Sequence, residues 1–429
     1  MSPSTTEEQS WRVWTFVMAA LAAGIALRLI WPLDIEYKGD EAWIFDQVRR
    51  LLAGAPWPWS GMVMSIGPPN PGLSLWVFGA LGFLTGAETA PELAQGIQLL
   101  NCFALVLFVL FIAFAIPAEQ REVWLWAAAI WAVNPIAIIL ERKIWQASVF
   151  PIFAVMFVAA WWSRHRRGGG LLLGVVGALL AQVHLAGAFF VISVVLWSWL
   201  YEGRAFPWRP WLIGCALGAL PALPWAIDLL THAGATGGSL RLRVPAPVGY
   251  LRWLIAPFGF DTAYALGWQV LDFLKWPRVG GIPTFLMGLL HATLIGIALF
   301  VGTHVLRGMR ADPRWRSPRQ LLVGSDPMFV LINSGLWGFN AVMTVVSLVA
   351  PPMHRHYMIC VTPLMMLWGA GIVFEFAVPY RRAVLGVMVG VQALVSIGLM
   401  TYIHQTQIIK GEYGTTWRAQ QPGFVKPGG

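Results

Sequence analysis

Five carboxylates lie close together soon after the first apolar stretch of the chain, at Asp34, Glu36, Asp40, Glu41 and Asp46. The whole protein has only 20 Asp and Glu residues, so this segment holds a quarter of them. Adjacent carboxylates near a low-dielectric boundary repel each other, which raises the pKa of one of them. Such a group suits a general base near neutral pH. Asp40 could instead serve only as a helix cap, for which Asp is a preferred residue, but capping does not account for Glu41.

Two positive residues and several polar groups follow in a short segment, Glu141-Arg142-Lys143-Ile144-Trp145-Gln146. Arg142 and Lys143 have the charge and the donors to bind the phosphate of a lipid-linked substrate. An ordinary interfacial anchor with Trp145 as a belt residue is the alternative. Glu141 and Gln146 are candidate substrate contacts, and either could take the place of a second catalytic carboxylate.

A third polar segment is Pro351-Pro352-Met353-His354-Arg355-His356-Tyr357. Three consecutive donors at a bilayer edge suit a phosphate leaving group whose negative charge grows during the reaction. We expect Arg355 and His356 to bind this phosphate, and His354 and Tyr357 to contact substrate; snorkelling of the long side chains is the alternative. His184 is a further candidate substrate contact, although a lone polar residue in an apolar helix more often bonds to a neighbouring helix.

The composition places these groups in a membrane protein. Hydrophobic residues make up 58% of the 429 residues and charged residues 11%, whereas a soluble domain has about 45–50% and about 25%. This excludes a cytosolic enzyme, a disordered chain and a small disulfide scaffold. The net charge of +9 comes from basic residues in short clusters between apolar runs, which is typical of membrane topology and not of a nucleic-acid-binding face.

A transmembrane helix needs roughly 20 mostly apolar residues. This criterion predicts an all-α, polytopic fold with about eleven spans. They lie near 13–33, 97–116, 123–140, 148–163, 169–185, 186–200, 211–230, 283–305, 327–349, 358–377 and 383–403. Residues 41–53 have the pattern of an amphipathic helix lying at the membrane surface, and the short apolar stretch 72–87 reads as interfacial or re-entrant.

Short loops with many Lys and Arg residues face the cytoplasm. One set of short loops holds thirteen basic residues and the opposite set three. We therefore expect a cytoplasmic N-terminus in the cytoplasmic membrane, with residues 1–404 forming one membrane domain. Two long outer loops, 34–96 and 231–282, and a short tail, 405–429, would then lie outside the cell. All the candidate residues fall on this outer side.

The first outer loop carries the motif Gly39-Asp40-Glu41-Ala42, then an amphipathic helix, then Pro68-Pro69-Asn70-Pro71-Gly72-Leu73 with Trp76. This order resembles the GT-C superfamily of glycosyltransferases, above all its dolichyl-phosphate-mannose–protein mannosyltransferase-like and aminoarabinose-transferase-like members. Those enzymes have an Asp-Glu-Ala motif and a Pro-Pro-Leu segment in their first outer loop, eleven or more spans and an outer-face active site. The sequence element at His356-Tyr357 and Pro363 also resembles a late element of these proteins.

The resemblance implies a glycosyltransferase that moves a hexose or pentose from a polyprenyl-phosphate donor to a protein, lipid or polysaccharide, with inversion at the anomeric carbon. Asp40, assisted by Glu41, would be the base. No cofactor is expected, and a need for a divalent metal stays open. The reading requires the Asp40-Glu41 doublet and the His354-Arg355-His356 triplet to meet in one lipid-accessible pocket. A transporter or flippase of lipid-linked sugars or small solutes is the alternative, although the spans hold few ionisable residues away from their ends.

Overall fold

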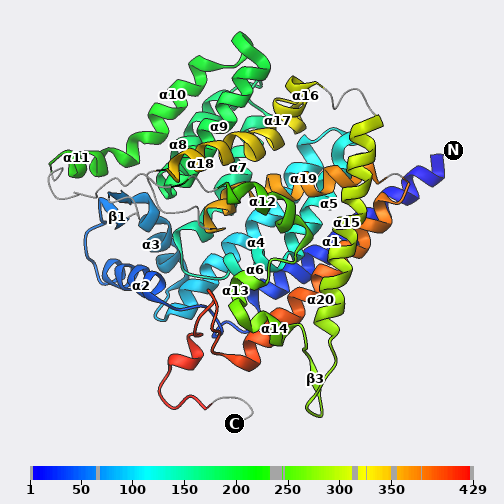
Figure 1. Cartoon of the computed structure of the whole chain (residues 1–429). Helices are drawn as coiled ribbons and strands as arrows, with labels where there is room; N and C mark the ends of the chain where they lie inside the picture. The colour runs from blue at the N-terminus through cyan, green and yellow to red at the C-terminus, as the bar shows by residue number, and fades with distance from the viewer. Residues whose placement is uncertain are drawn as a thin grey trace.

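A computed structural model shows that the chain forms a bundle of helices (Figure 1). It describes residues 3–63, 68–231, 244, 247–311, 317–324, 326–348, 355–377 and 379–425. Within these residues, strands occur only as two short antiparallel hairpins. Strand β1 (Ser60–Val63) pairs with β2 (Pro69–Pro71), and β3 (Arg278–Val279) pairs with β4 (Ile282–Pro283). The predicted all-α, polytopic class is confirmed.

Eight helical segments in the described part of the chain are long and apolar enough to cross a membrane. Five of them are α1 (Pro3–Leu29), α4 (Ala90–Ala115), α9 (Leu185–Glu202) with η2 (Gly203–Ala205), α15 (Leu286–Ala311) and α20 (Arg381–Thr406). The other three consist of shorter consecutive helices. They are α10 (Trp208–Ala219), η3 (Leu220–Ala222) and α11 (Leu223–Thr231); α17 (Pro327–Asn333), η7 (Ser334–Phe339) and α18 (Asn340–Val346); and η8 (Arg355–Val361) with α19 (Thr362–Phe376).

The three remaining predicted spans fall on shorter helices, α5 (Ala118–Val133) with α6 (Pro135–Leu140), α7 (Phe150–Trp162) and α8 (Gly169–Val183). The break between α5 and α6 has a local cause. Pro135 cannot donate the hydrogen bond that would continue α5, and Asn134 caps the new helix by accepting from the Ala137 N–H at 3.2 Å. The Asn134 amide also donates to the Ala256 carbonyl and to Gln392. The break therefore fixes where the chain leaves the bundle at residue 141.

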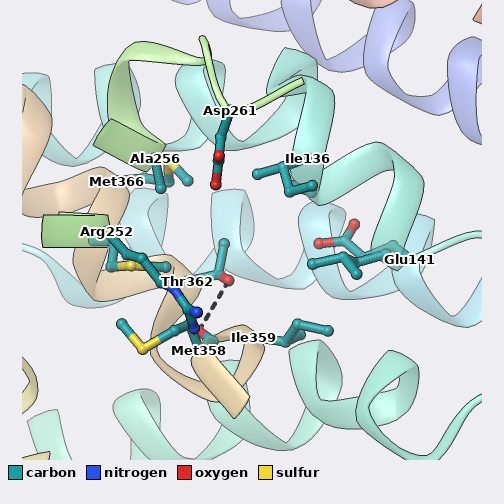
Figure 2. A pocket seen from close by; sticks show the side chains of 12 residues that line it. Ile136, Glu141, Arg252, Ala256, Asp261, Met358, Ile359, Thr362 and Met366 are labelled. Atoms are coloured by element: carbon teal, nitrogen blue, oxygen red, sulfur yellow. Dashed lines mark hydrogen bonds between the residues drawn. The ribbon is translucent and has the colours of Figure 1, made fainter. Parts of the chain in front are cut away.

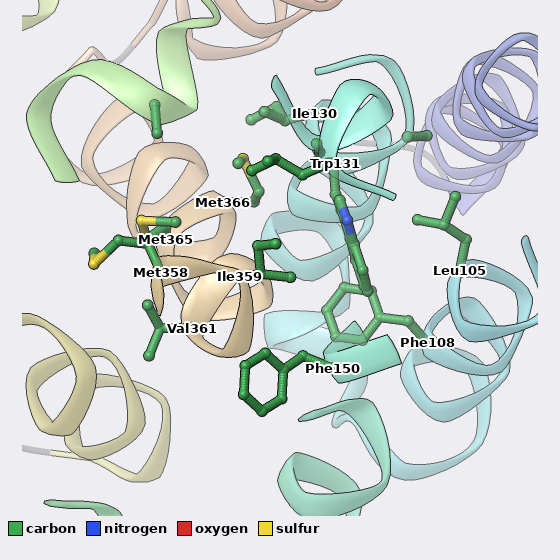
Figure 3. Close-up of a cluster of buried hydrophobic side chains, with 14 of the residues drawn as sticks. Leu105, Phe108, Ile130, Trp131, Phe150, Met358, Ile359, Val361, Met365 and Met366 are labelled. Carbon is green, nitrogen blue, oxygen red and sulfur yellow. The ribbon is translucent and has the colours of Figure 1, made fainter. Parts of the chain in front are cut away.

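Figure 3 shows part of the buried core, where apolar side chains of α4, α5, α7, η8 and α19 meet. Trp131 is fully buried and packs at 69° against Phe108, with ring centroids 5.4 Å apart. Its indole N–H donates to a carboxylate oxygen of Glu141 at 2.8 Å. The apolar core and the 141–149 segment are thus joined through one side chain.

The first long loop forms two helices, α2 (Gly39–Leu52) and α3 (Leu73–Thr85), separated by β1 and β2. Helix α2 is amphipathic, as expected: Ile44, Phe45 and Val48 are buried, and Asp46 is exposed. Glycine allows the two helices to pack closely, because a Cβ at Gly82 would lie 2.7 Å from the side chain of Val48. The loop is therefore a folded layer of the protein.

The segment 247–285 forms short helices and the second hairpin, and the final residues return to the first loop. The short helices are α12 (Val248–Ile255), η4 (Ala256–Phe258), α13 (Ala263–Leu266), η5 (Gly267–Gln269) and α14 (Val270–Phe273). Smaller elements elsewhere are η1 (Gln146–Val149), α16 (Pro318–Leu322) and η9 (Arg418–Gln420). In Figure 1 the C-terminal tail lies beside the first loop and α14. We call this end of the bundle, with residues 30–72, 141–149 and 407–421, the acidic-loop end.

Candidate functional site

The Asp40-Glu41 doublet lies in the first turn of α2, and its two side chains have different surroundings. Asp40 is exposed, whereas Glu41 is 2% exposed. Neighbouring residues in a helix are about 100° apart around its axis, so adjacent acids can face opposite environments. Glu41 accepts a hydrogen bond from the Lys38 backbone N–H at 3.1 Å, which caps the helix. The exposed carboxylate of Asp40 is therefore the one open to an incoming substrate.

Glu41 belongs to a buried group that we call the Lys143 cluster, consisting of Glu36, Glu41 and Lys143. The Lys143 Nζ lies 3.0 Å from a Glu36 oxygen and 3.4 Å from a Glu41 oxygen. It also lies 4.3 Å from the centroid of the Trp145 ring, a cation–π contact. The other Glu36 oxygen lies 2.8 Å from the Lys38 Nζ, so Glu36 is held by two ammonium groups and Glu41 by one.

The charges within the Lys143 cluster act on the pKa of its members. Burial raises the pKa of Glu41; the Lys143 ammonium lowers it in part, and Glu36 and Asp40 raise it again. Burial alone would lower the pKa of Lys143, but Glu36 and Glu41 outweigh it and the net shift is upward. Lys143 therefore stays charged at every physiological pH, whereas Glu41 takes up a proton more readily than an ordinary glutamate.

Arg142 points away from Lys143 and fixes the end of α1. Its guanidinium donates to the carbonyls of Leu27, Arg28 and Ile30 at 2.7–2.8 Å, and the residue is 1% exposed. These carbonyls are the acceptors that the last turn of a helix leaves without partners. The geometry gives Arg142 a role in the fold, and its binding of phosphate stays a prediction.

Both carboxylate oxygens of Glu141 are bonded to side chains within the protein. Its carboxylate pairs with the Arg28 guanidinium at 2.7 Å, and both side chains are almost completely buried. The other carboxylate oxygen accepts from Trp131. Two buried groups from distant parts of the chain thus neutralise each other beside the predicted site.

Gln146 joins the second outer segment to the proline-rich segment of the first. Its side-chain oxygen accepts from the Asn70 amide at 2.9 Å, and its nitrogen lies 3.4 Å from the Ser74 hydroxyl. Gln146 is 4% exposed. These bonds bring the Pro-Pro-Asn segment and the 141–149 segment, both chosen from the sequence, to the same place.

His184 caps α9 by accepting from the Ala186 N–H at 3.1 Å. Its ring centroid lies 5.2 Å from that of Tyr357 and 5.9 Å from that of Phe150. The structure therefore brings together His184 and Tyr357, two of the predicted substrate contacts.

The basic triplet is described only in part. His354 lies outside the described residues, and the side chains of Arg355 and His356 lie outside the described side chains. Their backbone begins η8, which packs against η1 and α7. The predicted meeting of Arg355 with Asp40 stays a prediction.

A cavity opens between α6, α12, η8 and α19 (Figure 2). It is a narrow space with a volume of about 30 Å³, and Ile136, Met358 and Ile359 form part of its apolar wall. Three charged residues line it, Glu141, Arg252 and Asp261. Asp261 points inward from above and Arg252 enters from the opposite wall, where Thr362 donates to the Met358 carbonyl. We call this space the polar cavity.

Asp261 did not emerge from the sequence, because it is a lone acid in a long, otherwise apolar stretch. Arg252 was noticeable only as one of several basic residues in the same loop. Burial raises the pKa of Tyr264, a residue of the same segment; Lys143 and Arg252 lower it in part, and Glu36 raises it.

An apolar groove lies on the other side of α12 and α19. Its empty volume is about 1170 Å³, and it is lined by Leu254, Leu336, Trp368 and other apolar side chains. Helix α12 contributes Arg252 to the polar cavity and Tyr250 and Leu254 to the groove. A polar cavity and a long apolar groove thus share two walls.

Within the described residues, no three His, Cys, Asp or Glu side chains gather as metal ligands would. No protein-family model matches the chain. No curated protein matches it in sequence.

The structure is similar to solved structures of two membrane proteins. For ArnT from Cupriavidus metallidurans, in the apo state and bound to undecaprenyl phosphate, the identities are 14% and 13% and the TM-scores 0.42 and 0.44. Each alignment covers 91% of this chain and 78% of ArnT. The archaeal oligosaccharyltransferase AglB from Archaeoglobus fulgidus, in complex with an inhibitory peptide and a dolichol-phosphate, has 13% identity and a TM-score of 0.41 over 97% of this chain and 59% of AglB.

Proposed function

We propose that this protein is a membrane glycosyltransferase that moves a sugar from a polyprenyl-phosphate donor to an acceptor on the outer face of the cytoplasmic membrane. The observation that carries the proposal is the shared wall between the polar cavity and the apolar groove. A donor of this class has a polar, phosphorylated head and a long hydrocarbon tail. The cavity and the groove offer matching surroundings for the two parts.

Helices α12 and α19 each contribute residues both to the polar cavity and to the apolar groove. On α12, Arg252 faces the polar cavity, and Leu254, two residues later, lines the groove. On α19, Thr362 lines the cavity and Trp368 the groove. A phosphate near Arg252 would leave the first prenyl units at the groove entrance. Arg355 begins η8, whose Met358 and Ile359 line the same cavity, so we retain it as a second phosphate ligand.

In the proposed reaction, the acceptor hydroxyl attacks the anomeric carbon of the sugar while Asp40 takes its proton. The new bond joins the acceptor oxygen to the sugar, and the bond from the sugar to the phosphate oxygen breaks. The polyprenyl phosphate leaves with the electron pair, and Arg252 and Arg355 stabilise its added negative charge. A single displacement of this kind inverts the anomeric carbon.

The arrangement of charge supports an extracytoplasmic site. The described basic short loops lie at the end of the bundle that is opposite to the acidic-loop end. At this basic end, Arg382 pairs with Glu122 at 2.6 Å and Arg164 pairs with Glu202. Short loops rich in Arg remain in the cytoplasm. The acidic-loop end, with Asp40 and the polar cavity, would then face outward.

The proposal is tested with the purified protein in liposomes, using a radiolabelled polyprenyl-phosphate sugar and envelope fractions as acceptor. Transfer of label to protein, lipid or polysaccharide is the expected result. Movement of the labelled donor across the bilayer without transfer would contradict the proposal and favour a flippase.

Arg252→Gln is expected to raise the KM for the donor about 10- to 100-fold, because a hydrogen bond to a charged group contributes about 1.5–3 kcal/mol. Michaelis kinetics over a range of donor concentrations measure it. Arg278→Gln is the matched control: Arg278 is half-exposed, pairs with Asp272 and lies on the hairpin β3–β4, away from the cavity. An unchanged KM in Arg252→Gln would remove Arg252 from the donor site.

Transfer activity is expected to fall on acidification at a pH above the ordinary pKa of a glutamate, which is about 4.3. The pKa of Glu41 is raised by burial, so its protonation starts at higher pH and removes the partner of Lys143. Glu41→Gln should have low activity throughout and no such acid limb. A pH–rate profile of both proteins measures this, and an identical acid limb in Glu41→Gln would assign the limb to another group.

A further inference from the structure

Among the described residues of the first loop, Asp34 is the only buried carboxylate outside the Lys143 cluster. Its side chain is 0% exposed. Its partners come from the end of the chain. His404 Nδ1 lies 2.5 Å from one carboxylate oxygen, and Gln407 Nε2 and Arg418 Nε lie 3.0 and 2.9 Å from the other. The His404 ring also stacks on Trp31, with centroids 4.2 Å apart. A buried charge requires partners of this kind.

The backbone of the tail runs along the same segment. The N–H of Trp417 donates to the Ile35 carbonyl at 2.9 Å, and the N–H of Arg418 donates to the Leu33 carbonyl at 3.0 Å. The Tyr413 hydroxyl donates to the Asp34 carbonyl. Residues 33–37 are therefore held by backbone and side-chain bonds from residues 404–418.

The next contacts lead to the proposed site. Glu36 follows Asp34 by two residues, is 4% exposed and lies 3.0 Å from the Lys143 Nζ. Lys143 in turn contacts Glu41, whose neighbour in sequence is Asp40. A continuous series of contacts thus runs from Arg418 through Asp34, Glu36 and Lys143 to the first turn of α2.

We propose that the C-terminal tail, residues 407–421, together with His404 at the end of α20, is a positioning element of the sugar-transfer site, in which Arg418 and His404 hold Asp34 and thereby hold Glu36 against Lys143. This inference rests on the proposed function. In this role the tail keeps the ammonium of Lys143 between two carboxylates, so that α2 and Asp40 keep one position while substrate binds. Arg418, His404 and Asp34 are positioning residues, because none of them touches the reacting atoms.

The charges predict the effect of releasing the tail. The groups that act on Glu41 are Lys143, Glu36 and Asp40, together with a backbone N–H. If Glu36 moves away, Glu41 loses the repulsion of a neighbouring carboxylate, and the attraction between Glu41 and the Lys143 ammonium becomes stronger. Its pKa then falls, as it also would if the opened loop admitted water. The acid limb of the pH–rate profile should therefore move to lower pH.

The test compares Arg418→Ala with Arg418→Lys and with Lys410→Ala. Lys410 lies in the same tail and is exposed, so its substitution removes the same charge without touching Asp34. We expect Arg418→Ala to lower kcat at least 10-fold, to change the donor KM less than threefold and to move the acid limb to lower pH. Arg418→Lys should recover at least a third of kcat, and Lys410→Ala should match the unaltered protein.

A second measurement does not depend on activity. Lys143 is 7% exposed, so an amine-reactive reagent should label it poorly, and Arg418→Ala should increase its labelling at least fivefold by mass spectrometry. If Arg418→Ala does not fold, the same measurement is made on Arg418→Lys, for which we expect a smaller increase in the labelling of Lys143. Unchanged labelling and an unchanged acid limb in Arg418→Ala would overturn the positioning role. Increased labelling in a protein without any transferase activity would instead support the positioning and reject the proposed function.

Discussion

Asp40→Asn is expected to lower the rate of sugar transfer about 100- to 10,000-fold, the usual contribution of a positioned general base. Asparagine keeps the size of the side chain but cannot act as a base. Asp40 is exposed in the first turn of α2, so the substitution leaves no buried group unpaired. The measurement is the initial rate of label transfer at saturating donor.

Asp46→Asn is the matched control for this experiment. Asp46 lies on the same helix, is exposed and forms only a surface pair with Arg50 at 2.9 Å. We expect it to keep more than half of the activity. Equal activity of Asp40→Asn and Asp46→Asn would exclude Asp40 as the base, whatever donor the protein uses.

Glu141→Ala is expected to lower the free energy of unfolding by about 3–5 kcal/mol, because it leaves the buried Arg28 guanidinium without its counter-charge. The same substitution removes the acceptor of the Trp131 indole N–H. The pair lies where α1 meets the 141–149 segment, with Arg28 0% exposed. Unfolding in mixed micelles with increasing SDS measures the loss.

Two further variants show whether the unpaired charge is the cause. Replacing both partners, Arg28→Met with Glu141→Leu, should recover most of the lost stability, since apolar residues of similar volume often replace a buried pair at little cost. Asp46→Ala, which removes a half-exposed pair, should cost less than about 1 kcal/mol. A double variant as unstable as Glu141→Ala would show that packing, and not charge, explains the loss.

The spans could be predicted from the sequence because hydrocarbon imposes a strong requirement on every crossing segment. The break at Asn134-Pro135 was missed, since both residues lie within one apolar run and the partners of Asn134, Ala256 and Gln392, are far away in the chain. The run was therefore read as a single span.

The sequence indicated which segments carry the candidate residues, but not which of their side chains are buried and which are exposed. The acidic doublet and the pair Arg142-Lys143 were found, yet only Asp40 among these four residues is exposed, and the other three side chains are buried and bonded within the protein. Adjacent residues point in different directions, and composition does not say which of the two is buried. Asp261 has no charged neighbour in sequence, so only the folded chain shows that it lines the cavity.

The bonds between Asp34 and residues 404–418 join positions almost four hundred residues apart. A nascent chain that has inserted its first helix therefore carries an acid whose partners have not yet been synthesised. The surface around Asp40 can reach its final form only after α20 and residues 407–418 have been synthesised and have bonded to the first loop. Under the proposed function, sugar transfer would begin only after this late contact has formed.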